Sequence, residues 1–282
     1  MIWLAWRQHR AALVTAAATF AAFCLALVLL SALELTSPVA DPLGLTNNRP
    51  ADYLGYVLLA GPTLLAALFA APLLARELEH GTHLFALSQS VSRGRWLTGH
   101  LLVGGLPPVL LFAVAAALYH QVVAPGPWYD GMAEGVYGAL PLVRGLFALS
   151  VGALFGVLAR RVLTAATLAG VTVTVVEVLA DLVRPYLFAP DVLLHPVTAS
   201  WSAEVWTLAS GYVRGGQLLP DGAVVGCTRD DAACLDNAGI TGRWTELHPI
   251  GHRVPLHWIE CAVYVALALA ALALLWRRTR RI

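Results

Sequence analysis

The residues best suited to chemistry lie in the apolar stretch at 162–184, where polar side chains recur at helical spacing. Steps of three and four residues place them on one face of a helix. They are Thr167, Gly170, Thr174, Glu177, Asp181 and Arg184. An ionisable group at the centre of a membrane helix costs about 2.5–3.5 kcal/mol, so such groups usually face a bundle interior or a water-filled cavity. The stripe therefore predicts a translocation path, or a seam between subunits, formed by Thr167, Thr174 and Glu177.

Four charged residues allow ion pairs in this region. Asp181 and Arg184 have a simple interpretation, in which they mark the membrane surface and pair with each other. Arg144 and Glu260 lie near the ends of two other apolar stretches. We expect Arg144 to pair with Glu177, whereas the alternative for Arg144 and Glu260 is to extend toward the lipid head groups.

Motifs for catalysis, metals and nucleotides are missing from the sequence. His80 and His83 lie beside Glu79, but their spacing is not that of a zinc protease and no Cys pair adjoins them, so we expect no metal site. All 18 basic residues are Arg, and without Lys the chain cannot form a P-loop, so we expect neither bound ATP nor another cofactor. A Gly-x-Ser-x-Gly elbow and basic patches with interleaved aromatics are also absent, which argues against that hydrolase class and against nucleic acid as a partner.

Two other functions stay open from the residues alone. The first is an intramembrane lipid-modifying enzyme that uses the region of Glu177, Asp181 and His195, which would require these side chains to meet at one buried site. The second is a non-transporting membrane anchor or sensor that binds a ligand through its longest connection.

The composition indicates that the segments that carry these residues lie in a membrane. Of 282 residues, 59% are hydrophobic and 12% charged, with a mean hydropathy of +0.71, whereas soluble domains contain about 25% charged residues. Runs of about 20 apolar residues without period-2 alternation predict membrane helices and not barrel strands. The expected spans are roughly 11–33, 53–75, 101–123, 141–159, 162–184 and 257–276. We therefore expect a single all-α polytopic membrane domain over 1–282 with six transmembrane helices.

The Arg residues predict the orientation of these spans. One set of connections contains Arg7, Arg10, Arg76, Arg93, Arg95, Arg160, Arg161, Arg277, Arg278, Arg280 and Arg281. The opposite short connections contain only Arg49. Because positive residues are retained inside, the Arg-rich side and both termini should be cytoplasmic, and the segment 185–256 should lie outside.

Cys227 and Cys234 lie in this outer segment, seven positions apart. An oxidising compartment favours a disulfide between them, and two free thiols are the alternative.

Within the spans, Gly152 and Gly156 form a small-xxx-small motif that predicts close packing inside the bundle. Spans two and three should be kinked by prolines, which remove backbone donors. The prolines are Pro62, Pro72, Pro107 and Pro108.

The connection from Arg76 to His100 is too long for a hairpin turn and too short for a domain. Its centre, Leu78 to Leu87, predicts a short amphipathic helix, which Ser88–Ser92 ends before Arg93 and Arg95 begin the next span. A short helix held between two long ones could carry motion from a soluble partner into the bilayer.

At these residues the sequence resembles the permease subunits of type-2 ATP-binding-cassette exporters. Their pattern is an Arg-Glu pair, an acidic residue, Gly-Thr, a Leu-containing stretch and a Ser-Arg turn. Here it reads Arg76-Glu77, Glu79, Gly81-Thr82, Leu84 to Leu87 and Val91-Ser92-Arg93. The opening MIWLAWRQHR and the closing WRRTRRI look like those of actinobacterial members.

The resemblance implies a six-helix exporter fold in a bacterial plasma membrane, with 1–10 as an interfacial helix. It implies that the coupling loop 77–95 holds a coupling helix (77–88) that docks on a separate ATPase subunit, which would bind ATP and Mg. The residues that would couple are Glu77, Leu78, Glu79, Gly81, Thr82, Leu84 and Phe85. It also implies a second membrane subunit and a small extracellular cap between spans five and six. The chain itself would not be an enzyme.

Overall fold

The computed structural model describes residues 2–33, 51–82, 84–85, 92–123, 126–197, 205–223, 227 and 232–280. The chain forms two compact units. The first comprises Met1–Gly126, Asp130–Ala180 and Glu260–Ile282, and the second comprises Pro127–Tyr129 and Asp181–Ile259. The segment 1–282, expected as one domain, thus contains a second compact unit.

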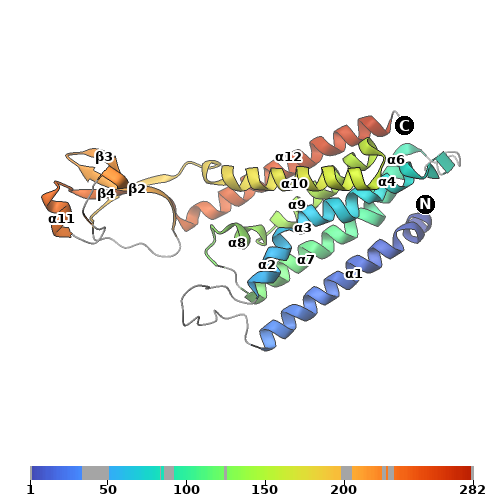
Figure 1. The fold of residues 1–282 in the computed structure, drawn as a ribbon, viewed down its shortest axis with the longest axis horizontal. Coiled ribbons are helices and arrows are strands. Elements are labelled where there is room, and N and C mark those ends of the chain that lie inside the picture. The colour runs from blue at the N-terminus through green and yellow to red at the C-terminus, as the bar shows by residue number, and fades with distance from the viewer. Residues whose placement is uncertain are drawn as a thin grey trace. The chain divides into compact units, whose positions relative to one another are not determined.

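The first unit is a helix bundle (Figure 1). Apart from the helix α11 described below, the α-helices within the described ranges are α1 Ile2–Ala32, α2 Asp52–Leu59, α3 Gly61–Leu64, α4 Ala71–Glu79, α6 Arg93–His100, α7 Leu106–Val123, α8 Gly131–Gly135, α9 Leu140–Ala159, α10 Val162–Val183 and α12 Arg253–Thr279. Among the described residues, six helical segments are long and apolar enough to cross a membrane. They are His9–Ala32, Gly61–Glu79, Arg93–Val123, Leu140–Ala159, Val162–Tyr186 and Ile250–Thr279. Six candidate spans in the described residues agree with the number predicted from hydropathy.

The helix boundaries differ from expectation at three places. The second span, predicted to begin at residue 53, begins at Gly61, because the separate helix α2 ends at Leu59. Residues 2–10, expected as a separate interfacial helix, are the first turns of α1, which continues to Ala32 because neither Gly nor Pro interrupts it. The third span begins at Arg93, about two turns before the predicted residue 101.

Spans two and three contain irregular turns beside their prolines. A π-helix over Leu65–Ala70 lies just before Pro72 near the start of α4, and a second π-helix over Leu101–Gly105 lies just before Pro107 and Pro108 in α7. Proline supplies no N–H to the preceding turn, so the backbone there must take another hydrogen-bonding pattern. The interruptions fall where the prolines predicted them.

Helix α9 packs against α4, the π-helix Leu65–Ala70 and α7. A Cβ atom at Gly152 would lie 2.8 Å from the carbonyl oxygen of Ala66 and 2.9 Å from the backbone nitrogen of Ala71, and one at Gly156 would lie 2.7 Å from the carbonyl oxygen of Ala71. Only glycine permits such an approach of two backbones. The small residues therefore pack within the bundle, as their spacing predicted.

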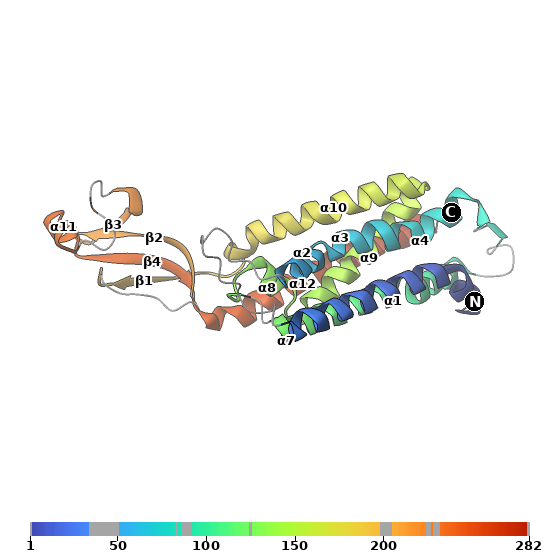
Figure 2. The same cartoon turned by 60° about the horizontal axis from the view of Figure 1, so that its bottom comes forward.

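Both ends of the chain lie at the same end of the bundle as the junction between α4 and α6 (Figures 1 and 2). We call this the Arg-rich end. Its described arginines are Arg7, Arg10, Arg76, Arg93, Arg95, Arg160, Arg161, Arg277, Arg278 and Arg280.

The second unit contains a four-stranded antiparallel sheet, which differs from the all-α class expected for the chain. Its strands are β1 Asp191–His195, β2 Trp206–Arg214, β3 Gln217–Pro220 and β4 Gly242–His248, in the order β1-β4-β2-β3. The strands combine Val, Thr, Tyr and Trp residues that favour extended backbone. A sheet forms because this segment is too polar for a span and has turns, such as Gly215-Gly216, with positive φ at both glycines.

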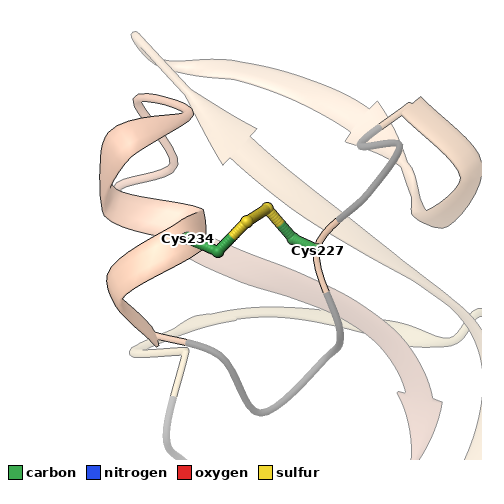
Figure 3. The surroundings of a disulfide bond; sticks show 2 residues. All are labelled: Cys227 and Cys234. Carbon is green, nitrogen blue, oxygen red and sulfur yellow. A yellow bond between two sulfur atoms is a disulfide. The ribbon is translucent and has the colours of Figure 1, made fainter.

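The disulfide predicted between Cys227 and Cys234 is confirmed (Figure 3). Cys234 belongs to the helix α11 Ala232–Asn237, and the Cα atoms of the two cysteines are 5.7 Å apart. The bond ties this helix to the segment that follows β3. Such a link suits a small unit with a limited hydrophobic core.

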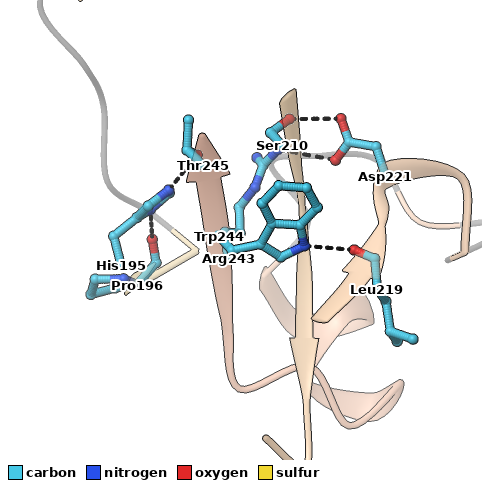
Figure 4. Close-up of polar contacts among 8 residues, drawn as sticks. All are labelled: His195, Pro196, Ser210, Leu219, Asp221, Arg243, Trp244 and Thr245. Atoms are coloured by element: carbon cyan, nitrogen blue, oxygen red, sulfur yellow. Dashed lines mark hydrogen bonds and ion pairs between the residues drawn. The ribbon is translucent and has the colours of Figure 1, made fainter. Parts of the chain in front are cut away.

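Polar contacts join β4 to β2 and to the segment around β3 (Figure 4). The carboxylate of Asp221 accepts hydrogen bonds from the Ser210 hydroxyl at 3.1 Å and from the Arg243 guanidinium at 3.3 Å. The indole N–H of Trp244 donates to the carbonyl oxygen of Leu219 at 2.9 Å.

Candidate coupling and transport site

The residues predicted to couple to an ATPase divide between a buried helix end and an exposed segment. Glu77 and Leu78 belong to the last turn of α4 and are each 8% exposed, so the amphipathic helix does not begin at Leu78 as we expected. Instead α4 continues through Glu79, because Leu78 packs in the bundle core.

Gly81 ends α4. Its φ of +72° is in the left-handed region that glycine adopts without strain, one residue after the C-cap His80. The Thr82 hydroxyl then donates to the carbonyl oxygen of Glu77 at 3.4 Å. The chain is turned away from the axis of α4 at a defined residue.

Leu84 and Phe85 follow this turn in helical conformation and are 63% and 70% exposed. The rest of the predicted coupling helix, at 83 and 86–88, lies outside the described residues. Two large apolar side chains exposed together at the Arg-rich end form a surface suited to contact with another protein.

The Glu77 carboxylate lies at the centre of a buried polar network. Its Oε2 atom accepts a hydrogen bond of 2.8 Å from the indole N–H of Trp96 and lies 3.3 Å from Nε2 of His100. Nδ1 of His100 is 2.7 Å from Nε2 of His9. The network joins α1, α4 and α6, so the end of α4 is held from two sides.

Sequence reasoning missed Trp96, His100 and His9 as partners of Glu77. The available signal was the spacing of Trp96 and His100, which lie four residues apart and therefore on one face at the start of the third span. Nothing in the local sequence indicated that this face would contact Glu77.

Glu79 connects the same helix end to α10. Its Oε2 atom accepts a hydrogen bond of 2.9 Å from the backbone N–H of Val162, the first residue of α10. The first N–H groups of a helix lack partners within the helix, and a carboxylate there also suits the positive end of the helix dipole. The tight turn that precedes α10 places Arg160 at a φ of 54°.

The ion pair predicted between Arg144 and Glu177 is present. Nη2 of Arg144 lies 2.9 Å from Oε1 of Glu177, and Nε donates to the same oxygen at 3.1 Å. The guanidinium also lies 5.9 Å from the ring centre of Tyr264 on α12. The pair joins α9 to α10 inside the bundle, away from the Arg-rich end.

The remaining polar residues of α10 have different surroundings. The Thr174 and Thr63 hydroxyls are hydrogen bonded at 2.9 Å, which joins α10 to α3. Beside them is a groove of about 490 Å³ lined by Thr63, Ala67, Ala166, Thr167, Gly170, Val171, Thr174 and Val175. Three hydroxyls, which can bind water or a polar solute, thus line a groove between otherwise apolar helices.

Among the other charged candidates, Glu260 adds to this polar face through its electrostatic interaction with Arg144. Arg184 donates to the carbonyl oxygen of Tyr129 at 3.2 Å and lies 5.2 Å from the ring centre of Trp206, whereas Asp181 is exposed. Glu260 on α12 is 7% exposed. The Asp181–Arg184 pair that we considered is therefore replaced by contacts within the second unit.

The enzyme alternative finds little support in the surroundings of His195. Its ring nitrogens lie 2.9 Å from the Thr245 hydroxyl, a contact that joins β1 to β4, and 2.9 Å from the carbonyl oxygen of the adjacent Pro196 (Figure 4). Among the described residues no group of three or more His, Cys, Asp and Glu side chains is arranged to hold a metal ion.

Comparison with known proteins identifies the family. A family model described as ABC-2 membrane transporter related matches residues 2–184, which is more than half of the chain. Comparisons with curated proteins and with solved structures found no match. With its six candidate membrane spans, the chain is a multi-pass membrane protein that belongs to the ABC-2 membrane transporter related family.

Proposed function

We propose that this protein is the transmembrane subunit of an ATP-driven exporter and that it docks on a separate ATPase through Leu84 and Phe85. The observation that carries the proposal is the exposure of both side chains directly after a helix end that is bonded to α6 and α10, with α1 joined to the same network through His100. The family supplies the class of partner. ATP and Mg would be bound by that partner, and this chain would have no enzymatic activity.

The contacts of α4 suggest how docking moves the membrane helices. A force on Leu84 and Phe85 acts across the turn at Gly81 on the last turn of α4. From there Glu79 pulls on the first turn of α10, while the Glu77 network keeps α1 and α6 with α4. Spans two and five therefore move together.

Movement of α10 would change the polar face that it presents. Thr167 and Thr174 line the groove, and the Arg144–Glu177 pair retains α10 at the other end of the span. We propose that this face contributes to the translocation path, completed by a second membrane subunit that is a copy or a relative of this chain. Transport is outward, as in exporters of this type.

The orientation completes the proposal. The Arg-rich end faces the cytoplasm of a bacterial, actinobacterial-type cell with both termini inside, because arginine-rich connections are retained on that side. The disulfide-linked sheet of the second unit then forms a small extracellular cap.

Co-purification tests the proposal. The tagged chain is extracted from its native membrane in mild detergent, and the soluble proteins that accompany it are identified and assayed for ATP hydrolysis. The double variant Leu84→Asp/Phe85→Asp places charges where an apolar contact is needed, and we expect it to lose the ATPase.

Ser92→Asp is the matched control. Ser92 is exposed in the same loop, where its hydroxyl caps α6 by accepting from the backbone N–H of Arg95, and Asp is an equally good cap. The control should retain the ATPase. The exporter assignment fails if no ATPase accompanies the unaltered chain, and the docking assignment fails if both variants bind it equally.

A further inference from the structure

A second, partly open cavity lies in the first unit, between α1, the π-helix Leu65–Ala70 with α3, and α7, and it has a volume of about 550 Å³. Its lining on α1 runs from Ala11 to Phe23. At 1.5 Å per residue this is a length of about 18 Å along the helix axis. We call it the bundle cavity; it shares no lining residue with the groove at Thr174.

The walls of the bundle cavity are apolar along this length. Phe20, Leu68 and Phe112 are among the side chains that line it, and Thr15 and Thr19 are the polar ones apart from an arginine. The Thr15 hydroxyl donates to the carbonyl oxygen of Ala12, and that of Thr19 donates to the carbonyl oxygen of Thr15. Their donors are thus used within α1, and the cavity offers an elongated surface suited to an alkyl chain.

Arg76 is the charged residue of this lining, and it lies at the Arg-rich end on α4. Its side chain is exposed, and within the part of the chain that the structure describes no carboxylate forms an ion pair with it. Glu77 and Glu79, its neighbours in sequence, are engaged by Trp96 and Val162. The guanidinium is therefore available to an anion at the mouth of an apolar cavity.

We propose that the bundle cavity binds one acyl chain of an anionic phospholipid whose phosphate is held by Arg76. A guanidinium presents paired N–H donors that match two phosphate oxygens. Basic pockets between membrane helices on the cytoplasmic side are typical sites for anionic head groups. A polar solute would find no free donors in the walls, and a cationic amphiphile would be repelled by Arg76.

The lipid would support α1 where protein contacts are few. Only 17% of the α1 span is buried in the protein, and His9 forms its polar contact with α6 just before the first cavity residue, Ala11. A chain in the cavity would fill the space between α1 and α3. This role is separate from ATPase docking, because Leu84 and Phe85 do not line the cavity.

Native mass spectrometry of the full chain in mild detergent tests the proposal. The probes are palmitoyl-oleoyl phosphatidylglycerol and palmitoyl-oleoyl phosphatidylcholine, which share their acyl chains and differ in net charge. We expect phosphatidylglycerol to bind about tenfold more tightly, since a charge-assisted contact with one arginine corresponds to about that ratio. Glycerol 3-phosphate without an acyl chain should not stabilise the protein against heat.

Three variants separate the head group from the chain. Arg76→Gln should remove the preference for phosphatidylglycerol, and Ala16→Phe should weaken binding of both lipids because Ala16 is a buried residue of the lining. Arg95→Gln, an exposed arginine at the same end but outside the lining, should bind as the unaltered chain does.

The proposal is wrong if the unaltered chain does not distinguish the two lipids, which would indicate only lipid at the protein surface. It is also wrong if Arg76→Gln keeps the preference, or if glycerol 3-phosphate stabilises as well as the lipid does. Arg76→Gln changes an exposed side chain, so it tests the proposal even if Ala16→Phe fails to fold.

Discussion

The Glu79 carboxylate accepts a hydrogen bond of 2.9 Å from the backbone N–H of Val162, and this contact joins the end of span two to the beginning of span five. It lies between the exposed segment at Leu84 and the helix that carries Thr174 and Glu177. Within the proposed mechanism, Glu79 is a positioning residue. It touches neither cargo nor nucleotide, but its hydrogen bond determines whether α10 moves together with α4.

Loss of this cap should loosen the first turn of α10. Glu79→Ala removes the acceptor, and we expect the free energy of unfolding to fall by about 1 kcal/mol, as is usual when a helix cap is removed. Hydrogen exchange of the amides at 162–165 should become faster. Glu79→Gln retains an acceptor oxygen and should have a smaller effect; unchanged exchange in Glu79→Ala would show that the cap is dispensable.

The Arg144–Glu177 pair should couple strongly in a double-mutant cycle. Replacing Arg144 leaves the Glu177 carboxylate buried without its charge partner and should lower the free energy of unfolding by about 3–5 kcal/mol, whereas replacing Glu177 should cost less, because Glu260 also interacts with Arg144. Arg144→Met with Glu177→Met removes both charges and should cost less than either single change. Denaturant unfolding in detergent measures the three variants. Additive losses would mean that the pair contributes no coupling.

Gly152→Val should separate α9 from α4. The new Cβ would approach the backbone at Ala66 and Ala71, and overpacking of this kind costs about 1–3 kcal/mol or more. Gly99→Ala is the matched control, since a Cβ there meets no atom within 4 Å. The thermal midpoint should fall for the first variant and stay constant or rise for the second. Equal midpoints would contradict the packing described for Gly152.

The disulfide offers a test of orientation. In a chain with Cys24→Ala and Cys261→Ala, only Cys227 and Cys234 remain. A reductant that does not cross membranes, followed by an impermeant maleimide, should label these two residues in intact cells. Labelling only after the cells are opened would place the sheet in the cytoplasm and reverse the proposed topology.

Reduction of the same bond should destabilise the second unit without unfolding the helix bundle. The disulfide closes a short loop and so restricts the unfolded chain, which stabilises the folded unit by about 2–3 kcal/mol. We expect Cys227→Ser/Cys234→Ser to become protease-sensitive within 205–248, while bundle peptides at 140–183 keep their protection. Equal sensitivity of both units would indicate that they unfold together.

The sequence by itself determined the features that depend on one stretch of chain. The number of spans follows from the number of apolar runs, because a run of about 20 apolar residues is long enough to cross the bilayer as one helix. The Arg144–Glu177 pair and the Cys227–Cys234 bond were also predicted, since few charged groups lie within the membrane and few cysteines lie outside it. Helical periodicity was enough to place Thr167 and Thr174 on one face.

Only the tertiary structure decided which distant groups meet. Glu79 and Val162 are 83 positions apart, and His9 and His100 are 91 positions apart. Neither local hydropathy nor spacing carries information about such partners, which depend on how helices pack against one another. The same holds for the sheet in 185–256, since its strands pair across intervals that include a helix and a disulfide. Burial of Leu78 against the core, and not its helical propensity, decided that α4 continues to Glu79.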